Sequence, residues 1–375
     1  MKSPNATIAL YLLAPLVAVA GFWTLATAGT PFKAPQKDWA NGELAAAYED
    51  QFDRAFPLRT AARNIWAALR YRLFAEGAPG LVVGEQGWFY TAQEFAAEPN
   101  AQHHLHSNLL WIAEVKQMLS RQGINLAVAV VPAKSRIYPE YLGRRQPAAS
   151  QVQLYSGARY WLREHGVSAA DLATELFLCK VRAQVYLKTD THWTPAGADC
   201  AAQAISRMTR TQLALANLPP ERYQRRSLGP VERRGDLMNY LPLAPLYAQL
   251  LPPKESFDRY EVVAPVTADG NALLGEARAA PLALIGTSYS AIPLWGFEAA
   301  LKFWTQVDVA NLSTEGHGPF RPMARALASG ELAALSPRLV IWEIPERYLL
   351  QPNPWRDQGA QALGAAEHQK ESSSS

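Results

Sequence analysis

The chain has 375 residues, of which 49% are hydrophobic and 18% are charged, and this balance predicts a folded globular protein rather than a disordered one. The 36 Lys and Arg residues barely exceed the 33 Asp and Glu residues, and the resulting net charge of +3 argues against nucleic acid as a partner. A chain of this length can form one large domain or two ordinary ones with a sizeable core.

The N-terminal segment Ile8–Ala28 contains no charged residue over 21 positions. A helix of that length spans the ~30 Å hydrocarbon core of a bilayer. Lys2 precedes the segment, which predicts that the short N-terminal flank stays in the cytoplasm and the rest is exported. A cleaved signal peptide is the alternative, because Ala26-Thr27-Ala28 resembles a small-residue cleavage site. We expect an anchor over residues 1–29, and both interpretations place the main body outside the cytoplasm.

The cysteines Cys179 and Cys200 have two possible states in an exported protein. An oxidising compartment permits a disulfide between them, and two buried free thiols are the alternative. The sequence leaves this choice open. Because the chain has no CxxC pair, we do not expect a metal ion bound through cysteine.

Residues 30–75 are expected to form a linker and amphipathic helices ahead of the main domain. Within Trp39–Phe74, apolar residues recur at helical spacing on both sides of Pro57, which predicts two helices. The next stretch, Leu81–Tyr90, predicts two short strands around a Gly-Glu-Gln-Gly turn.

Residues 76–355 alternate between helical patterns and short apolar runs, which predicts a doubly wound α/β fold. We expect a three-layer sandwich with a mostly parallel central sheet, preceded by the N-terminal anchor helix. Thr211–Ala280 lacks a clear period and predicts an insertion or surface loops, and residues 356–375 predict a disordered tail. The expected helices are Ser107–Arg121, Leu154–His165 and Pro195–Arg210, and the expected strands are Ile124–Val131, Val185–Leu187, Pro281–Gly286 and Arg338–Ile344.

The stretch VYLKTDTHWTPAGADC, Val185–Cys200, places Asp190 two residues before His192. In an extended segment, residues i and i+2 project to the same side. The carboxylate of Asp190 can therefore hold the Nδ1–H of His192 and leave Nε2 free to accept a proton. A helix start at Thr194-Pro195 sets where the extended segment must end, and Trp193 is expected to pack beneath the pair.

Ser288 is the candidate nucleophile for this pair. It follows the apolar run PLALIG, and ligands gather at the carboxyl ends of strands in open α/β sheets. A serine needs an adjacent base, and the base needs an orienting carboxylate, so the three residues predict a Ser-His-Asp triad. The alternative is that Ser288 and Ser290 only cap a helix that starts near Ala291.

The segments TDTHW and IGTSYS together resemble the AlgJ/AlgX family of bacterial O-acetyltransferases of the alginate system, whose catalytic domain is similar to the SGNH hydrolases. The resemblance implies an SGNH-hydrolase-like fold in which Ser288 is the nucleophile, His192 the base and Asp190 its orienting group. It makes the backbone N–H of Tyr289 an oxyanion-hole candidate, with Asn311–Gly318 as a further source of donors. Supporting stretches are Val82–Phe95, Val131–Leu142, Arg234–Leu243 and Trp342–Leu349.

The function implied by this resemblance is O-acetylation of an exported polysaccharide through an acetyl-serine intermediate. The acceptor would be mannuronate hydroxyls of alginate or a related exopolysaccharide. The acetyl donor would come from a membrane-bound O-acyltransferase, with other alginate acetylation proteins as partners, in the periplasm at the inner membrane. No cofactor is expected, because acetyl-CoA is not found outside the cytoplasm. The alternatives are a polysaccharide acetyl esterase of the same fold and a non-catalytic carbohydrate-binding scaffold.

Charged residues near the strand ends are candidates for substrate binding. Lys134 and Arg136 follow the strand that ends at Val131, so they could hold a uronate carboxylate, and solvated surface charges are the alternative. Glu343 and Glu346 are expected to be ion-paired structural residues, and a general-acid pair is the alternative. No metal site is expected, because no carboxylate or cysteine lies at ligand spacing from the one histidine cluster, which comprises His103, His104 and His106.

Overall fold

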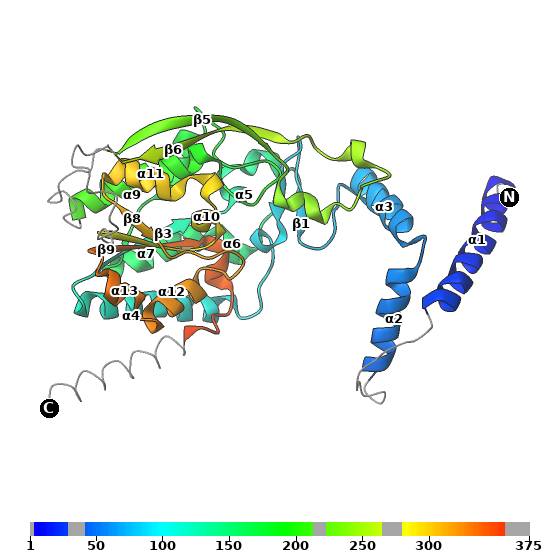
Figure 1. The fold of residues 1–375 in the computed structure, drawn as a ribbon, viewed down its shortest axis with the longest axis horizontal. Helices are drawn as coiled ribbons and strands as arrows, with labels where there is room; N and C mark the ends of the chain where they lie inside the picture. The colour runs from blue at the N-terminus through cyan, green and yellow to red at the C-terminus, as the bar shows by residue number, and fades with distance from the viewer. Residues whose placement is uncertain (1–3, 29–41, 213–222, 265–279, 357–375) are drawn as a thin grey trace, which may run out of the picture. The chain divides into compact units, whose positions relative to one another are not determined.

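The chain forms two compact units, each described here by itself. Figure 1 shows it as a computed structural model that describes residues 4–28, 42–212, 223–264 and 280–356. The N-terminal unit comprises Met1–Ala78 and Asn239–Pro252, and the large unit comprises Pro79–Met238 and Pro253–Ser375. The segment Asn239–Pro252, which lies inside the predicted main domain, therefore groups with the N-terminal unit. The predicted disordered tail lies outside the described residues, apart from Arg356.

The N-terminal unit is mainly helical where it is described. The two predicted amphipathic helices are confirmed as α2 (Glu43–Ala55) and α3 (Arg59–Leu69), and a π-helical turn, η1 (Arg70–Phe74), continues α3. The predicted anchor segment lies in α1 (Pro4–Ala28). Among the described residues, no helix combines the length and the apolar character needed to cross a membrane, so the predicted anchor is not shown.

The large unit is built around a five-stranded parallel sheet with the order β4-β3-β9-β7-β8. β3 (Asn125–Val131) and β7 (Leu282–Ile285) pair with opposite sides of the central β9 (Leu339–Pro345). The edge strands are β4 (Ser168–Ala169) and β8 (Val309–Asn311). The predicted α/β fold with a mostly parallel sheet is confirmed.

Helices cover both faces of the sheet and complete the predicted three-layer sandwich (Figure 1). Side chains alternate along β3, so that Leu126 and Val128 enter one core while Ala127 and Ala129 enter the other. One face carries α8 (Leu172–Cys179), α9 (Pro195–Gln212) and α11 (Phe297–Thr305), and the other carries α4 (Ala101–Arg121), α7 (Leu154–Glu164), α12 (Phe320–Ala328) and α13 (Glu331–Leu335).

Three parts of the predicted pattern are corrected by the structure. Val185–Leu187 is buried, but it forms an isolated bridge from Tyr186 to Trp193 instead of joining the sheet. The edge strands β4 and β8 have two and three residues, too few to show a period in the sequence. The region Thr211–Ala280 contains an antiparallel pair, β5 (Gln224–Arg233) and β6 (Glu255–Val263), whose many solvent-facing side chains hid it from the hydrophobic pattern.

Two local predictions are settled by the structure. The hairpin is confirmed, with β1 (Leu81–Val83) antiparallel to β2 (Phe89–Thr91). The cysteines are bonded to each other, so a disulfide from Cys179 to Cys200 ties α8 to α9 on one face of the sheet. The large unit also contains the short α-helices α5 (Lys134–Ile137), α6 (Ala149–Val152) and α10 (Ser288–Ala291) and the 3-10 helices η2 (Ala92–Glu94), η3 (Pro139–Tyr141), η8 (Pro293–Trp295) and η9 (Glu346–Leu350).

Candidate active site

Ser288 lies at the carboxyl end of β7, where the strand turns into the short helix α10. The helix starts at Ser288 itself, three residues earlier than the sequence predicts, because Thr287 caps it by accepting a hydrogen bond from the N–H of Tyr289. The preceding Gly286 is required by close packing, since a Cβ atom there would lie 2.4 Å from Oε2 of Glu343. The turn therefore presents the serine at the edge of the sheet.

Glu343, on the neighbouring strand β9, holds this turn in place. Its fully buried carboxylate accepts hydrogen bonds from the backbone N–H of Thr287 at 2.7 Å and from the hydroxyls of Thr287 and Ser290 at 2.9 and 3.1 Å. Burial raises the pKa of Glu343, while the bonds from Thr287 and Ser290 lower it, and the net shift is upward. The predicted role of Glu343 as an ion-paired residue is wrong, because its carboxyl group is bonded by the uncharged donors of Thr287 and Ser290. These two residues precede and follow Ser288 in the sequence.

Asp190, His192 and Ser288 form one continuous chain of hydrogen bonds. Oδ1 of Asp190 lies 2.6 Å from Nδ1 of His192, and Nε2 of His192 lies 2.7 Å from Oγ of Ser288. Asp190 is completely buried and His192 nearly so, while Ser288 is half-buried. The structure thus brings together three residues that the sequence separates by up to 98 positions, from 190 to 288.

The Asp190 carboxylate is held in its ionised form. Burial raises its pKa, but His192 and the backbone N–H groups of His192 and Asp236 outweigh that effect and lower the pKa to about 2. Its Oδ1 also accepts the N–H of His192 at 3.0 Å, and Oδ2 accepts the N–H of Asp236 at 3.0 Å. The negative charge of Asp190 beside Nδ1 of His192 keeps the proton on that nitrogen and leaves Nε2 as the acceptor.

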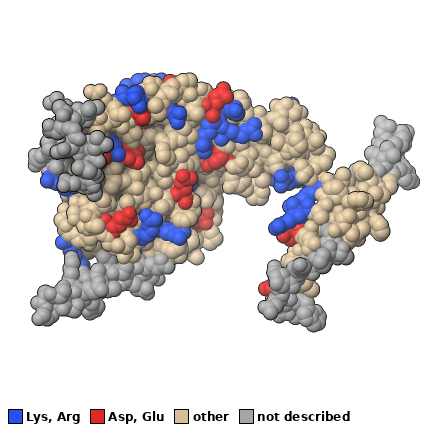
Figure 2. All heavy atoms as spheres, in the orientation of Figure 1, with Lys and Arg blue, Asp and Glu red and all other residues tan. Residues whose placement is uncertain are grey.

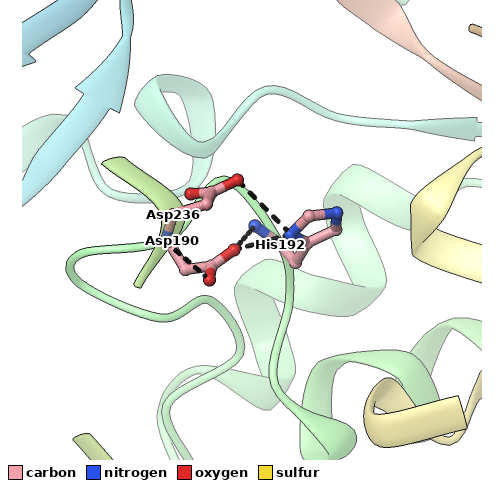
Figure 3. Close-up of side chains that lie close together, drawn as sticks. All are labelled: Asp190, His192 and Asp236. Atoms are coloured by element: carbon pink, nitrogen blue, oxygen red, sulfur yellow. Dashed lines mark hydrogen bonds and ion pairs between the residues drawn. The ribbon is translucent and has the colours of Figure 1, made fainter. Parts of the chain in front are cut away.

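A second carboxylate, Asp236, lies beside the same imidazole ring. Its Oδ2 is 3.8 Å from Nδ1 of His192, and its carboxylate also accepts bonds from the N–H and the hydroxyl of Thr191. Figure 3 shows both carboxylates on the Nδ1 side of the ring, with the other ring nitrogen pointing away from them. Burial, followed by the charge of Asp190, raises the pKa of Asp236. Gly235 makes this approach possible, because a Cβ atom there would lie 2.0 Å from the carbonyl oxygen of Thr189.

Known proteins of similar sequence cover most of the length of this chain. Residues 81–346 match the family model of the SGNH hydrolase-like domain of acetyltransferase AlgX. The "probable alginate O-acetylase AlgJ" of Pseudomonas putida is 39% identical over 351 residues, which cover 92% of this chain and 90% of that protein. The chain belongs to the AlgJ/AlgX family. The protein of the same description from Pseudomonas aeruginosa is 39% identical over 341 residues, covering 89% of this chain and 86% of its own length.

Solved structures agree with the SGNH-like fold of the family. The O-acetyltransferase domain of Pseudomonas putida AlgJ superposes with a TM-score of 0.68 at 37% identity, over 75% of this chain and 99% of that domain. AlgX of Pseudomonas aeruginosa superposes with a TM-score of 0.57 at 21% identity, over 81% of this chain and 70% of that chain, and this likeness concerns the fold alone.

The loop that carries Asp190 and His192 in this AlgJ/AlgX-family chain is held by charged side chains from other elements. The ammonium group of Lys134 donates to the backbone carbonyls of Leu187, Lys188 and Asp190 at 2.9, 3.2 and 2.6 Å. On the other side of the loop, Glu255, at the start of β6, accepts the backbone N–H groups of Lys188 and Thr189 and the Thr189 hydroxyl. Neither contact could be anticipated from local sequence.

These contacts contradict the predicted substrate-binding role of Lys134. Its side chain is 1% exposed, and three carbonyl oxygens already surround its ammonium group. Burial lowers its pKa to about 8, although Glu94 and Asp190 act in the opposite direction. Lys134 therefore supports the loop of His192 from inside the fold, and its buried ammonium group is occupied by backbone carbonyls.

Arg136 is also committed to the protein rather than to a substrate. Its guanidinium group pairs with Glu346 at 2.8 Å and donates to the carbonyls of Gln151 and Val152. This pair confirms the structural role predicted for Glu346 and contradicts the predicted substrate role of Arg136. On the face seen in Figure 2, cations and anions are interspersed over the large unit, so charge alone does not mark a binding track for an anionic polymer.

Aromatic side chains enclose the imidazole ring. Trp295 stacks on His192 with ring centroids 5.0 Å apart and planes 19° apart, so Trp295, and not the predicted Trp193, packs against the ring of the base. Trp193 is completely buried and contacts Tyr289 edge-on. The hydroxyl of Tyr289 donates to the carbonyl of Thr191. The side chain of Tyr289 thus ties the serine turn to the histidine loop.

Two of the predicted oxyanion donors, the N–H of Tyr289 and the side-chain amide of Asn311, are already engaged in this structure. The N–H of Tyr289 donates to the hydroxyl of Thr287 at 3.3 Å. The side-chain amide of Asn311 donates to the carbonyl of Ser290 and to Glu298 at 2.9 and 3.2 Å. These contacts give both groups a structural partner, so neither supports the predicted assignment.

The site has one cluster with the composition of a metal centre. Asp190, His192 and Asp236 place one ligand atom each within 4.8 Å of one another. Their oxygen and nitrogen atoms already pair with each other and with neighbouring N–H groups, which accounts for their closeness without an ion.

In the histidine cluster on α4, Nδ1 of His104 lies 3.0 Å from the carbonyl oxygen of Leu350.

Proposed function

We propose that this protein is an exported O-acetyltransferase that transfers acetyl groups to hydroxyls of alginate, or of a related exopolysaccharide, through an acetyl-serine at Ser288. The observation that carries the proposal is the unbroken hydrogen-bond chain from Asp190 through His192 to Ser288 at the carboxyl edge of the sheet. The names of the similar alginate O-acetylases supply the substrate class.

The geometry supports a two-step transfer. In the first step, Oγ of Ser288 attacks the acetyl carbonyl carbon while Nε2 of His192 takes the hydroxyl proton and then passes it to the departing donor group. In the second step, a sugar hydroxyl loses its proton to Nε2 and attacks the acetyl-serine, which frees Oγ to regain the proton. Asp190 stabilises the imidazolium that forms in each step, and this type of base contributes about 10²–10⁴-fold to the rate.

Export is part of the proposal. The Cys179–Cys200 disulfide supports an oxidising compartment, because disulfides persist outside the cytoplasm and are rare within it. The proposed location is the periplasm at the inner membrane, with the N-terminal segment as the attachment. The proposed partners are a membrane-bound O-acyltransferase that delivers acetyl groups and the other proteins of alginate acetylation. Cell fractionation tests the location, and recovery of the chain from the cytosol would contradict it.

The decisive experiment supplies a soluble acetyl ester and mannuronate oligosaccharides to the full-length protein and follows both products by mass spectrometry. Transfer predicts acetylated oligosaccharide in excess of free acetate, together with a transient acetyl adduct on the peptide that contains Ser288. Free acetate alone, with unmodified oligosaccharide, would identify an esterase. Neither product, from a folded protein, would favour a carbohydrate-binding scaffold.

A further inference from the structure

The outer face of the helix formed by α3 and η1 exposes large apolar side chains. Trp66, Leu73 and Phe74 are 62%, 67% and 62% exposed, and Ile65 and Leu69 are 44% and 45% exposed. Positions 65, 66, 69 and 73 recur at the spacing of one helical face, and these four residues are here called the apolar stripe. Phe74 adds a further exposed apolar side chain at the end of η1. A contiguous exposed apolar surface of this kind marks an interaction site.

The side of the same helix that faces the protein is small and polar. Asn64 and Ala68 are the buried residues of α3, and Nδ2 of Asn64 donates to the carbonyl of Pro242 at 2.5 Å within the same unit. The amphipathic pattern is therefore inverted relative to a helix that packs its apolar face on a core. Packing within the unit does not explain why the outer positions carry Trp, Leu and Phe.

All charged residues within α3 and η1 themselves are arginines. The sequence from 59 to 74 contains four arginines and no acidic residue. Arg59 pairs with Asp53 and Arg70 pairs with Glu76. Arg63 and Arg72 form no ion pair with any residue that the structure describes. They lie on the two flanks of the stripe, where long cationic side chains can extend along an apolar surface toward anionic groups.

We propose that the apolar stripe of α3 and η1 lies in the headgroup region of a membrane that contains anionic phospholipids. Trp, Ile and Leu on one face with arginines on its flanks are the features of a helix that lies in the plane of the membrane interface. A bilayer accounts for both halves of the pattern at once, since its acyl boundary accepts the stripe and its phosphates accept the arginines. The inference concerns the N-terminal unit alone and does not depend on acetyl transfer.

The disulfide provides a direct test. Because Cys179 and Cys200 are bonded to each other, an introduced cysteine is the only free thiol of the oxidised protein. Leu69→Cys places a polarity-sensitive fluorophore on the stripe. Thr60→Cys is the matched control, because Thr60 is exposed on the same helix. It lies nine residues before Leu69, which is about two and a half turns, so it projects from the opposite side of the helix. Both full-length variants are reconstituted in phosphatidylcholine vesicles with and without phosphatidylglycerol and with quenchers on the acyl chains.

The proposal predicts that the Leu69 label shifts to shorter wavelength and is quenched by the acyl chains, while the Thr60 label is not. Both variants carry the same N-terminal segment, so a difference between the two labels reports on the stripe itself. Replacing Arg63 or Arg72 with Gln in the Leu69→Cys variant lowers the ratio of lipid-exposed to water-exposed label about fivefold each on anionic vesicles, because a cation near such a surface contributes ~1 kcal/mol.

Equal, water-like signals from both labels on anionic vesicles would overturn the proposal. Shielding of the Leu69 label only in native membranes, and not in pure lipid, would replace the bilayer with a membrane protein as the occupant. Turnover of a soluble acetyl ester is measured alongside, because loss of lipid contact leaves it unchanged. A failure of this inference is thereby distinguished from a failure of the proposed function.

Discussion

The two halves of the active site are held in position by different kinds of structure. Ser288 continues directly from β7, and its turn is fixed by a helix cap and by Glu343 on the adjacent strand. Asp190 and His192 instead lie on a loop outside the sheet, supported by Lys134, Glu255 and Asp236 from three separate parts of the chain.

This difference shows that the serine turn and the histidine loop are positioned by different interactions. Ser288, the proposed nucleophile, is positioned by the end of β7, a strand held by backbone hydrogen bonds to β8 and β9. His192, the proposed base, depends on a few charged side chains that bond to backbone groups of its loop. Removing one of these side chains is costly because its backbone partners lose a hydrogen bond. Replacements away from the reacting atoms should therefore harm the histidine half more than the serine half.

The largest effect is expected from removing the nucleophile. Ser288→Ala should lower acetyl-ester turnover by about 10⁴-fold or more, because no other group can carry the acetyl intermediate. The fold should be unaffected, since the half-buried hydroxyl bonds only to His192 among the contacts described here. Ser156→Ala, on the exposed side of α7, is the matched control and should retain full turnover. Normal turnover in folded Ser288→Ala would remove the serine from the mechanism.

The two carboxylates beside His192 should differ strongly. Asp190→Asn should lower kcat by about 10³–10⁴-fold, because an amide no longer fixes the proton on Nδ1. Asp236→Asn should lower it only about tenfold, since its carboxylate is 3.8 Å from Nδ1 and mainly supports Thr191. Steady-state kinetics of both variants decide the matter, and equal losses would show that the carboxylates share the role.

The supports of the two halves can be compared directly. Lys134→Met keeps the volume of the side chain but removes the donor to the carbonyls of Leu187 and Asp190, while the carbonyl of Lys188 keeps the N–H of Phe89. The variant should therefore lose about 1–3 kcal/mol of unfolding free energy and have a lower kcat. Glu343→Gln keeps an acceptor for the N–H of Thr287 and should cost less on both measures. Chemical denaturation and kcat are measured for each variant. A greater loss of stability and kcat in Glu343→Gln than in Lys134→Met would show that the serine turn, and not the histidine loop, depends more on its buried charged support.

The smallest effect is the pH dependence of stability. Asp190 has a folded-state pKa of about 2, below its ordinary value of 3.8. Its contribution of about 2 kcal/mol is therefore fully present well above pH 4 and is lost as the pH falls toward 2. Asp236 has a raised pKa, so its effect has the opposite sign, and stability from this group falls as the pH rises through the acidic range. Denaturation of Asp190→Asn and Asp236→Asn between pH 6 and 3 should give stability differences from wild type with opposite slopes.

Much of this protein was determined by local sequence. Apolar runs marked β3, β7 and β9, because strands buried on both faces need continuous hydrophobic residues. The Asp-x-His spacing and a serine after a strand end identified the three residues that meet in the structure. These signals were readable because each depends on neighbours within a few positions.

Only the tertiary structure decided what surrounds those residues. Asp236 reaches the site from 46 positions beyond Asp190, and Trp295 supplies the ring that stacks on His192. Lys134 carries a charge that the sequence assigned to the surface, yet the fold turns it inward to three carbonyls. The physical reason is that buried polar groups find their partners through packing between distant segments, and no local period or spacing records which segments will meet.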